Sequence, residues 1–105
     1  MNYHQLGEEL QEQQKWPEAV DAYRKAIATN PNFSWSYHKL GQALAKLKQW
    51  KEAVDAYRKA IEINPHFSWS YHKLGEALTE LKKWEEAAEA YQKAVEMNPH
   101  FTWSY

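Results

Sequence analysis

Apolar residues recur with a helical spacing between about residues 35 and 48. They are Tyr37, Leu40, Gly41, Leu44 and Leu47. Steps of three and four residues place such side chains on one face of an amphipathic helix. Ser34 or Ser36 lies where a hydroxyl can cap the first turn. The pattern therefore predicts a first helix over about 35–48.

A second apolar stripe follows after a short polar stretch and predicts another helix over about 51–63. Its members are Ala53, Val54, Tyr57, Ala60 and Ile61. Asn64-Pro65 closes the segment, because proline lacks an amide hydrogen and disfavours the α conformation in the residue before it. The two stripes together predict a helix–turn–helix unit.

This two-helix pattern is written three times. Tyr3, Tyr37 and Tyr71 are each 34 residues apart, and Trp16, Trp50, Trp84 and Pro31, Pro65, Pro99 keep the same step. A fixed period of this length is typical of stacked repeats that bury their apolar faces against one another. We expect one domain over 1–105 with repeats at about 3–36, 37–70 and 71–104, and Tyr105 opens an incomplete fourth.

The repeated positions resemble the tetratricopeptide repeat (TPR). The shared positions in the second copy are Tyr37, Leu40-Gly41, Ala53, Tyr57, Ala60 and Pro65. The resemblance covers essentially the whole chain. It implies an all-α fold, an α-solenoid of three antiparallel helix pairs in a right-handed superhelix. It also implies a non-catalytic scaffold for a peptide or protein partner.

Other origins remain open. The Phe-Ser-Trp-Ser-Tyr-His phrasing also resembles the near-identical repeats of long bacterial arrays and of consensus-style engineered arrays. Two alternatives therefore stand beside the binding scaffold. One is a structural or engineered module that self-associates, and the other is an accessory segment of a larger enzyme.

The composition of the chain narrows the classes of partner that we expect it to bind. The formal net charge of −1 argues against nucleic acid or an anionic membrane surface, since both favour a clear basic excess. The chain has no cysteine, no apolar run of bilayer length and no signal-peptide pattern at its first residues. We expect a cytoplasmic protein without disulfides.

Catalytic, cofactor and metal chemistry find little support. All three glycines fall inside predicted helices, which leaves no glycine-rich phosphate loop. His4 with Glu8 and His72 with Glu76 are spaced i,i+4, so each pair offers only two metal ligands. We therefore predict no enzyme activity, no cofactor and no physiological metal site.

The resemblance places a partner on the concave surface, formed mainly by the first helix of each pair. The residues expected there are His4, Glu8, Trp35, His38, Gln42, Lys46, Trp69, His72, Glu76 and Glu80. A tryptophan row and a histidine row stand out among them. The alternative for the tryptophans is packing in the seam between repeats, since Trp is often partly buried.

One familiar role is not expected. Family members that hold the acidic tails of heat-shock chaperones use a clamp of Lys and Asn on this surface. The matching positions hold His4, Glu8, His38 and Gln42, and further glutamates oppose a carboxylate ligand. The sequence therefore predicts that this clamp is absent.

The two ends of the array differ. In the first copy Glu9 and Gln13 replace Ala43 and Leu47, as in a terminal repeat adapted to water. The last predicted helix, over about 85–97, carries an apolar strip that includes Ala87 and Ala90, and we expect it to be bare. We predict self-association there, tail-to-tail or end-to-end, through Tyr91, Ala94, Val95, Phe101, Trp103 and Tyr105.

Overall fold

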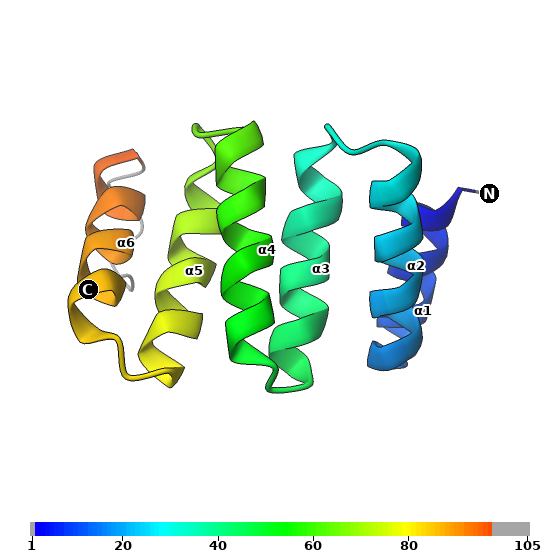
Figure 1. Cartoon of the computed structure of the whole chain (residues 1–105), viewed down its shortest axis with the longest axis horizontal. Helices are drawn as coiled ribbons and strands as arrows, with labels where there is room; N and C mark the ends of the chain where they lie inside the picture. The colour runs from blue at the N-terminus through cyan, green and yellow to red at the C-terminus, as the bar shows by residue number, and fades with distance from the viewer. Residues whose placement is uncertain (1, 98–105) are drawn as a thin grey trace.

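The computed structural model describes residues 2–97, which form six helices joined by short turns (Figure 1). The helices are α1 (Tyr3–Glu12), α2 (Trp16–Thr29), α3 (Ser34–Lys46), α4 (Trp50–Ile63), α5 (Ser68–Glu80) and α6 (Trp84–Met97). They follow one another across the molecule in chain order, and each packs beside the next. The predicted all-α repeat fold is confirmed. Phe101, Trp103 and Tyr105 lie outside the described residues.

The first residues of the helices and the residues that cap them differ from the prediction. Each second helix begins at its tryptophan, one residue earlier than expected. The predicted serine cap of α3 is wrong, because Phe33 occupies the N-cap and no side chain bonds to the first turn. Helix α1, by contrast with α2 to α5, has a capping box, in which the Asn2 side chain accepts from the Gln5 amide while the Gln5 side chain accepts from the Asn2 amide.

The turn inside each repeat is a Schellman motif. In the second copy the Gln49 amide donates to the Leu44 carbonyl and the Lys48 amide to the Ala45 carbonyl. This geometry requires a left-handed residue after the helix. Lys48 takes that conformation with φ of 60°, and Gln14 and Lys82 do the same in the other copies. The chain therefore makes the same turn three times without glycine.

Each repeat closes on a glycine–tyrosine contact between its two helices. A Cβ added at Gly41 would lie 2.6 Å from the ring of Tyr57, and one at Gly7 would lie equally close to Tyr23. Both rings are almost fully buried. The returning glycine thus reflects a packing need, and the helices approach closely because it has no side chain.

The ends of the array bear out one prediction and correct another. Glu9 and Gln13 are exposed, as expected for a terminal repeat adapted to water. The expected bare strip is wrong for Ala87, Ala90 and Ala94, which are buried at 3%, 6% and 0% exposure. These small side chains point into the α5–α6 pair, whereas Tyr91 and Val95 are only half-buried.

Candidate functional site

A groove crosses the stack and is built by side chains from all six helices. Its cavity measures about 420 Å³. The lining residues are Gln11, Trp16, Gln42, Ala45, Lys46, Trp50, Tyr57, Lys73, Glu76, Thr79, Glu80 and Tyr91. Because every helix contributes, stacking of the repeats creates this surface and no single repeat holds it.

Four of the predicted partner-binding residues line this groove, and a fifth lies beside it. The four are Gln42, Lys46, Glu76 and Glu80. Glu8 lines a neighbouring hollow with Gln11, Trp16 and Lys46, which extends the groove toward α1. Residues expected on the concave surface therefore form part of the polar side of the groove, and their role in partner binding stays a prediction.

The histidine row lies elsewhere, and for two of its members the expected groove contact is wrong. His38 is fully buried and His72 is 4% exposed. The His38 ring stacks on Trp35 at 5.1 Å between centroids and lies 5.0 Å from Phe67, the N-cap of α5. Its Nδ1 is 2.9 Å from Ser70 Oγ on α5. This histidine therefore links α3 to α5 and is closed to a partner.

Burial sets the protonation of His38. Loss of water around the ring, together with the positive charges of Lys39 and Lys73, lowers its pKa to about 3. The ring is therefore neutral near neutral pH. Its Nε2 is buried and has no hydrogen-bond partner within residues 2–97.

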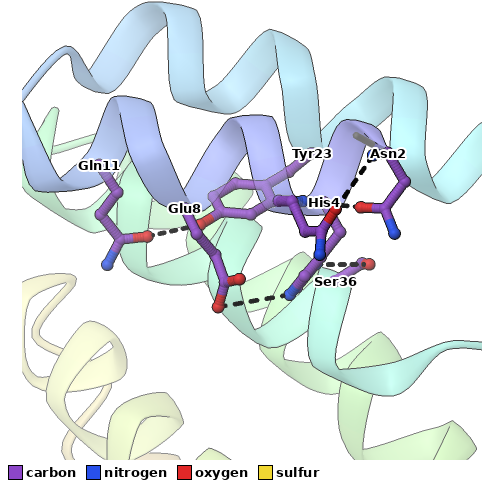
Figure 2. A network of polar contacts seen from close by, with 7 residues as sticks. Asn2, His4, Glu8, Gln11, Tyr23 and Ser36 are labelled. Carbon is purple, nitrogen blue, oxygen red and sulfur yellow. Dashed lines mark hydrogen bonds and ion pairs between the residues drawn. The ribbon is translucent and has the colours of Figure 1, made fainter.

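The first copy has the equivalent histidine–serine contact, and its histidine is more exposed to solvent. Figure 2 shows His4 between Glu8 and Ser36, with Nδ1 3.1 Å from Ser36 Oγ and Nε2 3.6 Å from Glu8 Oε2. Phe33 meets the ring edge-on at 5.2 Å. Burial lowers the pKa of His4, and the nearby Glu8 carboxylate opposes that shift.

The tryptophan row follows the seam alternative at Trp35. Its ring lies 5.2 Å from Phe67 of the next repeat and carries the Lys39 ammonium 5.2 Å above it. Trp69 stacks on His72 at 5.5 Å and carries Lys73 in the same way. Neither indole is among the residues that line the groove, so the groove contact expected of Trp35 and Trp69 is not seen there.

Sequence reasoning missed the aromatic side of the groove. Trp16 and Trp50 begin the second helices, and Tyr57 and Tyr91 lie farther along them. The concave surface was expected mainly from the first helices, so residues of the second helices were not among the predicted site residues. Their periodic return at the starts of second helices was the available signal.

A buried hydrogen-bond acceptor without a partner among the described residues lies in the groove wall. This acceptor is Gln42 Oε1. In the first copy the Tyr23 hydroxyl donates to Gln11 Oε1 at 2.7 Å (Figure 2), whereas Ala45 occupies the equivalent place in the second copy. A buried acceptor of this kind favours a ligand that brings a donor.

The charges of the groove are mixed. Lys73 pairs with Glu76 at 3.3 Å, and the Lys46 ammonium lies 5.8 Å from the centre of the Trp16 ring. Glu80 adds a further negative charge. The groove therefore has no single sign with which to attract a strongly charged ligand.

Residues 2–97 contain neither a cluster of metal ligands nor a helix that could span a membrane. No three His, Asp or Glu side chains in this range converge as a metal site would require. None of its helices has both the length and the apolar character needed to cross a bilayer.

Comparison with known proteins agrees with the observed repeat. Models described as tetratricopeptide repeat match residues 34–67 and 68–101, and a model described as TPR repeat matches residues 7–48. A search of curated proteins gives no match.

Solved structures give a close match in shape. The chain superposes on MamA with a TM-score of 0.95 at 25% identity, covering 98% of this chain and 60% of that one. The first TPR of Spaghetti (RPAP3), bound to an HSP90 peptide, gives 0.94 at 25% identity and 97% and 81% coverage. The TPR2B domain of yeast Sti1, in complex with pHsp70, gives 0.86 at 32% identity, with coverage of 90% and 76%.

Proposed function

Because the chain belongs to the tetratricopeptide repeat family, we propose that it is a non-catalytic scaffold that binds an extended peptide segment in the groove. The observation that carries this proposal is the groove itself, to which all six helices contribute. The similar structure of Spaghetti was solved with an HSP90 peptide and that of yeast Sti1 in complex with pHsp70, which supports the same mode of use.

The chemistry of this groove favours a different peptide from an acidic chaperone tail. Glu76 and Glu80 would repel a ligand with several carboxylates. Trp16 and Trp50 offer apolar surface instead, and Gln42 Oε1 offers a buried acceptor for a backbone N–H. We therefore expect a peptide of low net charge with one or two bulky apolar side chains.

A phage-displayed library of random peptides, selected on the full chain, tests this proposal. Peptides that bind should lose at least about tenfold in affinity for Gln42→Leu, since about 1.4 kcal/mol is tenfold and a lost hydrogen bond contributes on that scale. Arg58→Ala on the outer surface is the matched control, because Arg58 pairs with Glu86 away from the groove. Equal affinity for both variants would contradict a groove site.

A second candidate function is self-association through the α6 end. The observation that favours it is the exposure of Trp84, which reaches 61%, whereas its equivalent Trp50 is half-buried. Tyr91 and Val95 are also partly open there. Sedimentation across a concentration series tests this candidate, and a monomer at about 100 µM would rule it out, because an interface of useful affinity saturates by then.

A further inference from the structure

A second cavity opens at the α1–α2 end of the stack and shares no lining residue with the groove. It measures about 910 Å³, and its walls include Tyr3, His4, Asn30, Phe33 and Ser36. Tyr3 and Phe33 are 46% and 43% exposed, and with Trp84 they are the large apolar side chains most open to solvent in the described part of the chain. Two of these three side chains therefore line one hollow.

The middle of the array shows what the same place holds inside the stack. There Trp35 lies against His38 and against Phe67 of the following repeat, at 5.1 Å and 5.2 Å between ring centroids. His4 and Phe33 are the equivalents of His38 and Phe67, and they lie 5.2 Å apart. The cavity thus has two of the three aromatic groups of this cluster.

The third aromatic group, the indole, has no equivalent at the matching position of the first copy. The residue one period before Trp35 is Met1, which has no ring. An indole that entered the cavity would meet the half-buried His4 ring and the exposed face of Phe33, as Trp35 meets their equivalents. Aromatic rings at such separations attract one another beyond simple burial.

The chain itself carries a segment of the required sequence. Phe101-Thr102-Trp103 repeats the pattern of Phe33-Ser34-Trp35 and Phe67-Ser68-Trp69, and it follows α6 in the sequence. Helix α6 lies at the opposite end of the stack from α1 (Figure 1). We propose that the cavity binds the Trp103 indole of a second copy, so that molecules join head-to-tail. This inference rests on the second candidate function and names the acceptor surface for it.

Further features agree with this direction of assembly. Trp84 lies on α6, so stacking of a second copy's α1 against α6 would cover the third exposed aromatic group. The described outer faces carry matching inter-repeat ion pairs, Arg24–Glu52 and Arg58–Glu86, which shows that the same register continues from repeat to repeat. A contact between unlike surfaces that does not close on itself produces chains of molecules rather than a closed dimer.

A mixing experiment with two full-length variants tests the proposal. Trp103→Ala removes the donor and Phe33→Ala damages the acceptor, so each variant alone should associate at least tenfold more weakly than wild type in sedimentation velocity. Mixed together, they should form a heterodimer, because one keeps its cavity and the other keeps its tail. Thr102→Ala and Asn32→Ala are neighbouring controls that should associate like wild type.

The outcomes separate this inference from the second candidate. If Phe33→Ala associates as wild type while Trp103→Ala does not, the contact is tail-to-tail and the cavity proposal is wrong, although self-association stands. If wild type stays monomeric at about 100 µM, both are wrong. Circular dichroism confirms that each variant keeps its helices.

A second measurement tests the proposal even if the Phe33→Ala variant does not fold stably. A synthetic peptide of residues 98–105 is titrated into ¹⁵N-labelled Trp103→Ala chain and followed by NMR. We expect shifts of the Tyr3, His4 and Ser36 amides, which a Trp103→Ala peptide should not produce. Shifts confined to α6, or none at millimolar peptide, would overturn the proposal.

Discussion

The middle helix pair, α3–α4, and the last one, α5–α6, have nearly the same sequence pattern but different surroundings. Tyr57 on α4 is 2% exposed, whereas the equivalent Tyr91 on α6 is half-buried. Val54 is buried and its equivalent Ala88 is exposed. The difference arises because α5 covers one side of α4, while within residues 2–97 no further helix packs on α6.

How deeply a side chain is buried in the array therefore depends on whether a neighbouring helix pair packs against it. At a matching helix position a side chain on the outer side of the pair is more exposed where no next repeat packs on it, as Tyr91 is relative to Tyr57. Stability should then follow the interfaces between repeats as much as the repeats themselves. Substitutions made in matched pairs, one in the middle and one at the α6 end, can test this view.

The tyrosine pair should give the largest contrast. Tyr57→Ala removes a buried aromatic ring, and we expect it to lower the free energy of unfolding by about 3–5 kcal/mol. Tyr91→Ala should cost less than about 2 kcal/mol, because part of that ring already contacts solvent. Urea unfolding followed by circular dichroism measures both. Equal losses would show that the last repeat is as enclosed as the middle one.

The sequence predicted the fold almost completely, because the apolar period and the Asn-Pro stops determine six helices and their order. The resemblance to the family placed Gln42 and Glu76 on the concave surface, and both line the groove. The sequence misplaced His38, since periodicity puts a residue on a helix face without saying whether the next repeat covers that face. The contact of His38 with Ser70 joins α3 to α5 and depends on the stacking geometry.

It also missed the Arg24–Glu52 and Arg58–Glu86 pairs, which cross from one repeat to the next. Spacing along one helix indicates only pairs within that helix. Side-chain contacts between repeats depend on how far each helix pair is rotated against its neighbour, and a sequence period of 34 does not contain that angle.

The buried histidine should make the fold sensitive to acid. The folded pKa of His38 is about 3, well below the value near 6.5 expected in the unfolded chain. Below pH 6.5 the unfolded state therefore binds more protons, and the free energy of unfolding should fall by about 2 kcal/mol by pH 5. The lowered pKa values of His4 and His72 act in the same direction.

Urea titrations at pH 7.5 and pH 5 on His38→Asn isolate the middle site. An asparagine oxygen can still accept from Ser70 Oγ but does not titrate in this range. The variant should lose about 2 kcal/mol of the wild-type pH dependence, whereas His66→Ala, in an exposed loop, should keep it. An unchanged dependence in His38→Asn would place the acid sensitivity in the outer repeats.

The turns should give the smallest effect, with the opposite sign. Lys48 and Lys82 hold left-handed φ values of 60° and 61°, a conformation that glycine adopts without steric cost. We expect Lys48→Gly and Lys82→Gly each to raise the free energy of unfolding by about 0.5–1 kcal/mol, net of the larger entropy of an unfolded glycine. Thermal unfolding of both variants measures this gain. Because the turn bonds are internal to each repeat, the two gains should be equal, and a clear difference would mean that these turns also depend on their neighbours.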